Sequence, residues 1–122
     1  MMNFLKLGAI ALTTIIALTA CRPAGVRVKI VNESGKTVET VEFWHEQADQ
    51  LEPTLLEKIG PIESGKENKI LLREITGEGA YSTQATFEDG EQLKGGAGYV
   101  EGGYRVVETI EKTEIISEIN FY

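Results

Sequence analysis

The fold is decided by residues 81–91, which read Tyr81-Ser82-Thr83-Gln84-Ala85-Thr86-Phe87-Glu88-Asp89-Gly90-Glu91. Up to residue 87, side chains suited to a core alternate one by one with polar side chains. Because successive side chains of a β-strand point to opposite faces, this alternation predicts a strand with one buried face. The Asp-Gly pair that follows is a hairpin signal, so the chain is expected to turn and pair with the next strand.

Further strand patterns lie on both sides of this hairpin. Residues 26–30 alternate apolar with charged side chains, and the strand patterns at 93–100 and 104–110 flank a Gly102-Gly103 turn. In all, about seven or eight short strands are expected, with turn signals and no amphipathic helix between them. This pattern predicts an all-β fold with a single domain, an antiparallel β-sandwich of immunoglobulin-like type. A small barrel is the alternative.

The inward positions of these strands define the expected core. The apolar phase slips by one residue between Val38 and Val41, which predicts a β-bulge or a late strand start. The whole chain has one cysteine, so no internal disulfide can stabilise the fold. The side chains expected to be mostly buried are Val28, Ile30, Phe43, Tyr81, Phe87, Ile110, Ile119 and Phe121.

The least strand-like segment runs from His45 to Lys58. Within it, Pro53 predicts the start of a short helical turn, Pro53–Lys58, that ends at Gly60. A long insertion between strands is a place where function concentrates. The other interpretation is a connection that crosses from one sheet to the other.

The first 20 residues differ in composition from the rest of the chain. One positive charge, at Lys6, precedes an uncharged run over residues 7–18, and small residues follow. This layout is typical of a secretory signal peptide. The run is shorter than the roughly 20 apolar residues that a membrane-spanning helix needs.

The end of that segment, Leu18-Thr19-Ala20-Cys21, resembles the lipobox of bacterial lipoproteins. The resemblance implies that the Cys21 thiol receives diacylglycerol, that the signal is cut before Cys21, and that the new amino group is acylated, for example with palmitate. It divides the chain into a signal peptide (1–20), a lipid anchor with a short tether (21–25) and a β-sandwich domain (26–122). The alternative is an ordinary cleavage site with a free thiol, which is unusual in an exported protein.

The same resemblance implies a location. A lipidated protein is held in the cell envelope by its membrane anchor. Arg22 rather than aspartate follows Cys21, and by resemblance to lipoprotein sorting this favours the periplasmic face of the outer membrane, if the host has one.

The mature chain is acidic. Of the charged side chains only Lys6 lies in residues 1–20, so the remaining 102 residues carry 11 basic and 19 acidic groups, a formal net charge of −8. This balance argues against a nucleic-acid partner and against broad adhesion to an anionic membrane. The acidic side chains crowd the later half and are nearly all expected to face solvent. The basic residues close to the anchor are Arg22, Arg27, Lys29 and Lys36.

No group of residues points to catalysis or to a metal. His45 is the only histidine and no serine lies in a Gly-x-Ser-x-Gly elbow, so a hydrolytic triad is not expected. One histidine and one cysteine do not make a zinc site, and an acidic hairpin turn explains the oxygens of residues 88–91 better than calcium does. The glycine-rich residues 95–103 lack the ending of a phosphate loop. We therefore predict a protein that is not an enzyme, with no catalytic residue, metal or cofactor.

Aromatic side chains near the second glycine turn have two interpretations. Tyr99 and Tyr104 flank the Gly102-Gly103 turn and are expected to cover the bare glycine strand. The alternative is that they anchor a protein partner together with Trp44.

These exclusions lead to a binding function. The sequence predicts a lipid-anchored, non-enzymatic protein-binding or inhibitory module, for example an immunity lipoprotein against a toxin that acts in the periplasm. One alternative is a structural accessory subunit of an envelope assembly. Another is a small-ligand carrier, which would need a cavity between the sheets.

The predicted partner-binding residues are Glu88, Asp89 and Glu91. Because neighbouring strands run in opposite directions, the turn at 32–36 should lie at the end of the sandwich away from the anchor. The acidic turn and the Gly102-Gly103 turn should lie at opposite ends. We expect the acidic turn at the end away from the membrane, where its carboxylates would attract a basic partner.

Overall fold

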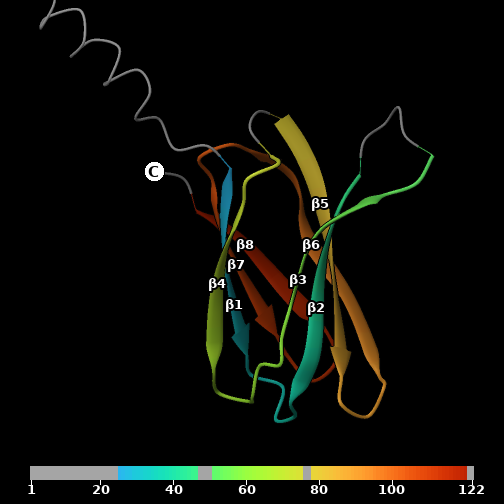
Figure 1. Cartoon of the computed structure of the whole chain (residues 1–122). Coiled ribbons are helices and arrows are strands. Elements are labelled where there is room, and N and C mark those ends of the chain that lie inside the picture. Colours follow the sequence, from blue (N-terminus) through green and yellow to red (C-terminus); the bar gives the residue numbers. More distant parts are fainter. Residues whose placement is uncertain (1–24, 47–50, 76–77, 121–122) are drawn as a thin grey trace, which may run out of the picture.

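The computed structural model describes residues 25–46, 51–75 and 78–120 and shows two facing β-sheets (Figure 1). Sheet A has the strand order β4-β1-β7-β8, and sheet B has the order β3-β2-β5-β6. The predicted all-β sandwich is confirmed, and the barrel alternative is wrong because the described strands form two separate sheets. The immunoglobulin-like type stays a prediction. The strands are β1 (Val26–Asn32), β2 (Val38–His45), β3 (Thr54–Ile59), β4 (Glu67–Leu72), β5 (Glu78–Phe87), β6 (Gln92–Glu101), β7 (Arg105–Ile110) and β8 (Ile115–Asn120).

Sheet B is antiparallel throughout, whereas sheet A is mixed. In sheet A, β1 pairs antiparallel with β4 and parallel with β7, and β7 pairs antiparallel with β8. The β1–β7 pair is therefore the exception to the predicted antiparallel pattern. Within the described residues, no helix is long and apolar enough to cross a membrane.

The strand directions divide the loops between two ends of the sandwich. The Gly25 carbonyl accepts a hydrogen bond from the Gly103 amide at 2.7 Å, so the start of β1 and the Gly102-Gly103 turn share one end, here called the proximal end. The turns 33–37, 60–66, 88–91 and 111–114 lie at the opposite, distal end, at the bottom of Figure 1. The predicted separation of the acidic turn from the Gly102-Gly103 turn is confirmed.

Apolar side chains from both sheets fill the space between them. The Phe43 and Tyr81 rings contact each other there, with their centroids 6.0 Å apart. Of the predicted core residues, Ile119 is only half-buried and Phe121 lies outside the described residues. The predicted residues that are buried are Val28, Ile30, Phe43, Tyr81, Phe87 and Ile110.

The phase slip in β2 is a β-bulge, as predicted. The register between β2 and β5 shifts between Val38 and Thr40. The bulge lets Val38 and Val41 both face the core although they are three residues apart, and both are fully buried.

The short helical turn predicted for Pro53–Lys58 is wrong. Residues 54–59 form β3, which pairs antiparallel with β2. The β2–β3 register shifts between Phe43 and Trp44, and Leu56 and Ile59 both pack against the core. This three-residue spacing mimics a helix in the sequence. Because β2 and β3 share sheet B, the segment from His45 to Lys58 does not cross between the sheets. After β3 the chain crosses to sheet A at residues 60–66.

The edge strands β6 and β8 lie against each other and bring the two sheets close together along one side. A Cβ atom added to Gly95 would lie 2.7 Å from the Cβ of Ile115, so only glycine fits there. A glycine in the strand therefore lets the two strands approach closely at this position.

Candidate functional site

The candidate site is the distal end, where the predicted partner-binding residues lie. It consists of the four turns 33–37, 60–66, 88–91 and 111–114. These turns carry seven acidic and three basic side chains. The acidic ones are Glu33, Glu63, Glu88, Asp89, Glu91, Glu111 and Glu114, and the basic ones are Lys36, Lys66 and Lys112.

Asn32, at the end of β1, holds two of these turns together. Its side chain is fully buried. The Nδ2 amide donates to the Lys36 carbonyl and to the Ile62 carbonyl, both at 2.8 Å. A buried amide whose hydrogen bonds are made stabilises the geometry of its loop, because breaking them would leave polar atoms unpaired away from water.

Ser34 completes this network on the other side of Asn32. Its backbone amide and its hydroxyl both donate to Asn32 Oδ1, at 3.0 Å and 2.6 Å. The Lys36 amide donates to Ser34 Oγ, and the Gly35 amide donates to Ser64 Oγ in the neighbouring turn. The 33–37 turn is thus held in one conformation by the side chains of Asn32, Ser34 and Ser64.

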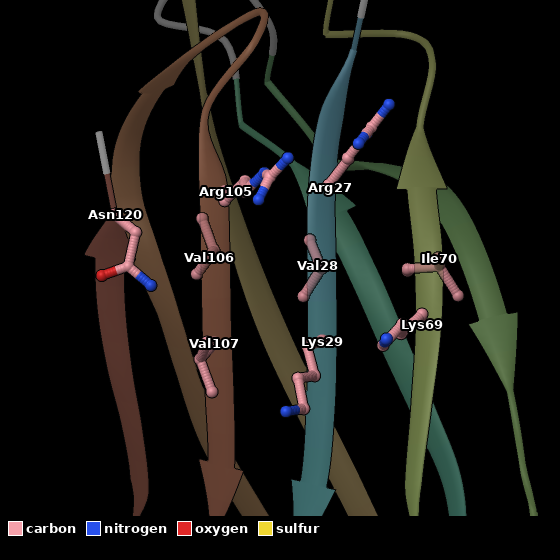
Figure 2. Close-up of a pocket in the computed structure, with 9 residues that line it drawn as sticks. All are labelled: Arg27, Val28, Lys29, Lys69, Ile70, Arg105, Val106, Val107 and Asn120. Carbon is pink, nitrogen blue, oxygen red and sulfur yellow. The ribbon is translucent and has the colours of Figure 1, made fainter. Parts of the chain in front are cut away.

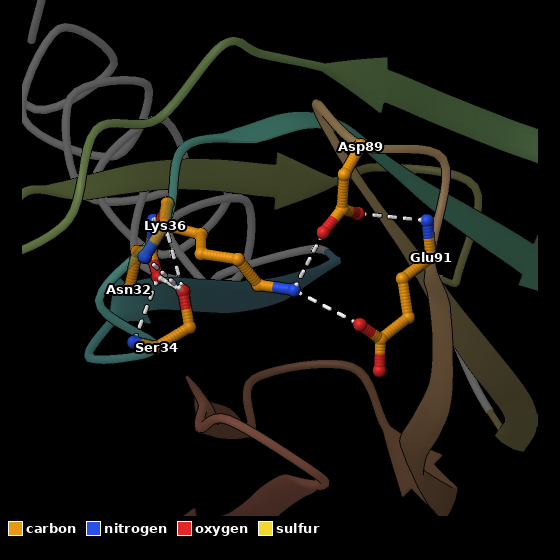
Figure 3. Close-up of polar contacts among 5 residues, drawn as sticks. All are labelled: Asn32, Ser34, Lys36, Asp89 and Glu91. Carbon is orange, nitrogen blue, oxygen red and sulfur yellow. Dashed lines mark hydrogen bonds and ion pairs between the residues drawn. The ribbon is translucent and has the colours of Figure 1, made fainter.

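Lys36 links this turn to the acidic turn (Figure 3). Its ammonium group lies 2.9 Å from Asp89 Oδ2 and 2.9 Å from Glu91 Oε2. It also lies 4.4 Å from the centre of the Phe87 ring, a cation–π contact. The Glu88 amide donates to the Thr37 carbonyl, so backbone and side chains join the two turns.

The ion pairs shift the pKa values of Lys36 and Asp89. The hydrogen bond with Glu91, and then the one with Asp89, raise the pKa of the Lys36 ammonium. The backbone amide of Glu91, and then Lys36, lower the pKa of the Asp89 carboxyl. Both shifts favour the charged forms, so the contacts persist at neutral pH.

The structure changes the role of two of the three predicted site residues. Lys36 partly neutralises Asp89 and Glu91. Glu88 is exposed beside them and makes no contact with Lys36 in the described structure. Lys36, which the sequence groups with the basic residues near the anchor, lies at the far end of the sandwich from Gly25. A reversal of charge at Asp89 or Glu91 therefore disturbs the fold of the turn as well as its surface. Cys21 lies outside the described residues.

The same contacts bear on the calcium alternative. The Lys36 ammonium already lies between the Asp89 and Glu91 carboxylates, where a cation would have to bind. Among residues 25–46, 51–75 and 78–120, no group of three or more histidine, cysteine or acidic side chains is placed to hold a metal ion.

A buried carboxyl group lies between the sheets, and sequence reasoning missed it. Glu108 on β7 is fully buried, which contradicts the expectation that it faces solvent. The Tyr81 hydroxyl donates to its Oε1 at 2.7 Å, and the Ser117 hydroxyl donates to its Oε2 at 2.6 Å. The sequence held a signal for this, since Glu108 lies between Val106 and Ile110 in the inward phase of its strand.

The aromatic residues near the proximal end divide between the two interpretations. Tyr104 packs against the core, as expected for covering. Tyr99 remains 53% exposed. Trp44 lines a shallow open hollow on the outer face of sheet B with Pro53 and Lys94.

Among the comparisons with known proteins, only the comparison with solved structures finds similar proteins. No protein-family model matches the sequence, and no curated protein matches it. An NMR structure of a protein from Eubacterium rectale is similar, with a TM-score of 0.50 and 13% sequence identity over 81% of this chain and 91% of that chain. At that identity the likeness shows a shared fold alone.

Proposed function

We propose that this chain is a lipid-anchored protein of the cell envelope that binds a basic protein partner with its distal end and catalyses no reaction. One observation carries the proposal: the distal turns form a rigid, acidic surface at the opposite end of the sandwich from Gly25. If Cys21 is lipidated, Gly25 is only the fourth residue after the lipid-bearing cysteine. The distal end is then the part of the domain that reaches farthest from the membrane.

Rigidity supports a binding role because association loses less entropy when the loops are already ordered. The Asn32 hydrogen bonds and the Lys36 ion pairs fix the 33–37 and 88–91 turns before any partner arrives. The excess of carboxylates around them would steer a basic partner and speed its association. An inhibitory module, such as an immunity lipoprotein against a periplasm-acting toxin, is the specific form we propose.

The two alternatives differ in what they need. A small-ligand carrier needs a cavity between the sheets, whereas the hollow at Trp44 opens on the outer face of sheet B and a second hollow, lined by Arg27 and Lys69, opens on the outer face of sheet A. An accessory subunit of an envelope assembly would use a protein-binding surface too, and it is distinguished by the identity of the partner.

The test is site-specific photo-crosslinking of the full chain in its native membranes. A photoreactive residue replaces Glu63, Glu88 or Glu114, which are exposed and make no contact with Lys36 in the described structure. Matched controls replace Glu57 on the edge strand β3 or Glu118 on the outer face of sheet A, which are exposed glutamates outside the distal turns. We expect one discrete crosslinked product from the distal positions and none from the controls.

Charge reversal then tests the acidic character of the surface. Glu63→Lys with Glu88→Lys should weaken the captured complex at low salt, with little effect at high salt and little change in the melting temperature. Crosslinks that arise equally from Glu57 and Glu118, or a complex that is indifferent to this reversal, would assign binding to another surface.

A further inference from the structure

A group of basic side chains lies on the outer face of sheet A near the proximal end, although the chain as a whole is acidic. We call Arg27, Lys29, Lys69 and Arg105 the basic face. Figure 2 shows them side by side on the neighbouring strands β4, β1 and β7. They line an open hollow of about 300 Å³.

The strand register brings like charges directly opposite each other. Lys29 pairs with Lys69 across β1 and β4, and Arg27 pairs with Arg105 across β1 and β7. Like charges at opposing positions of neighbouring strands destabilise a sheet. The Lys29–Lys69 pairing does not stabilise the sheet, and the positive charge that Arg27 and Lys69 add to this face favours an anion from outside the domain.

Two acidic side chains, Glu67 and Glu118, lie on the same face of sheet A. Glu67 pairs with Lys29 at 3.2 Å, with both side chains more than 40% exposed, and such exposed pairs are weak. Glu118 on β8 lies opposite Val107 on β7, so it is one strand beyond the basic face. Toward the distal end, the next outward-facing residues of β1 and β7 are Val31 and Thr109, which carry no charge.

The basic face lies near Gly25, the residue that precedes β1. Arg27 is two residues after Gly25, and its backbone amide donates to the Tyr104 carbonyl, next to Arg105. Cys21 precedes Gly25 by four residues, which span at most about 14 Å when extended. A lipid on Cys21 would therefore hold the basic face within reach of the headgroups.

We propose that the basic face contacts the phosphates of anionic phospholipids in the membrane that holds Cys21, and so tilts sheet A toward that membrane. This inference rests on the lipid anchor of the proposed function. The anchor supplies a high local concentration, so a few charges suffice to bias orientation even though the acidic chain would not adhere to a membrane by itself. The acidic distal end is repelled by the same surface and is left free for a partner.

The test compares two exposed leucines at the same end of the molecule. Leu71 lies opposite Arg27 on the outer face of sheet A, and Leu55 lies opposite Trp44 on the outer face of sheet B. They are 37% and 43% exposed. Leu71→Cys and Leu55→Cys each provide one labelling site for a fluorophore, because the only native cysteine is the lipidated one.

The labelled, lipidated full chain is reconstituted in phosphatidylcholine vesicles with or without phosphatidylglycerol and with a quencher on the headgroups. We expect at least about twofold stronger quenching at residue 71 than at residue 55 in the anionic vesicles, and equal quenching in neutral vesicles or at high salt. Arg27→Gln with Lys69→Gln should remove the difference. The matched control, Lys66→Gln with Lys112→Gln at the distal end, should keep it.

Three results would overturn the proposal: equal quenching at both positions in anionic vesicles, a difference that survives Arg27→Gln with Lys69→Gln, or one that follows protein density rather than phosphatidylglycerol. The last would assign the basic face to the acidic end of a second copy. Failure of the anchor itself is seen separately, because the unsubstituted chain would then take up the thiol label at Cys21 and would not float with the vesicles.

Discussion

Glu108 carries a charged side chain that is fully buried between two sheets packed mainly by apolar side chains. Burial raises its pKa, and the hydroxyls of Ser117 and Tyr81 oppose that rise by donating to the charged form. Burial, and then Glu108, raise the pKa of Tyr81, so the phenol stays a donor. The network satisfies the carboxyl but does not remove the desolvation of its charge.

This raised pKa predicts an unusual pH dependence of stability. Above the ordinary glutamate value of 4.5 the unfolded chain has released the proton while the folded state still holds it. The free energy of unfolding therefore falls as the pH rises through the window from 4.5 to the folded pKa. Glu108→Gln removes this term, so denaturant unfolding between acid and neutral pH should show the variant gaining stability relative to the parent as pH rises. Exposed Glu118→Gln is the control, and a Glu108→Gln difference that does not change with pH would contradict the account.

At the scale of strands, sequence patterns are reliable where a strand has one buried and one solvated face. The hairpin at 81–91 and the turn at 32–36 were predictable because alternation and turn residues are local signals. The edge strand β3 was not, because a register shift spaces Leu56 and Ile59 like helix positions. The β1–β7 parallel pairing and the Lys36 contacts join residues far apart in the chain, which no local pattern encodes.

The loss of stability on truncating an apolar side chain should depend on how deeply that side chain is buried. Phe87 on β5 is fully buried, so Phe87→Ala should reduce the free energy of unfolding by about 3–5 kcal/mol through lost transfer energy and a cavity. Ile119 on the edge strand β8 is half-buried, so Ile119→Ala should have a smaller effect, below about 2 kcal/mol. Chemical denaturation measures both. Equal losses at the two sites would show that β8 packs more tightly than described.

At the scale of the whole molecule, charge is divided along the long axis of the sandwich. The basic face lies near Gly25 on sheet A, and the acidic turns lie at the distal end. In the proposed account the first faces lipid and the second faces a protein partner. This division gives an orientation to a domain whose fold alone does not specify one.

The proposed membrane anchoring and the orientation of the domain both depend on the lipid at Cys21, so the most direct test is the intact mass of the mature chain extracted from membranes. We expect a protein that begins at Cys21 and carries the added mass of the diacylglyceryl and acyl groups. We also expect Cys21→Ser to abolish acyl labelling and to release the domain from the membrane. A mature chain that begins at another residue and carries no lipid would contradict the central claim.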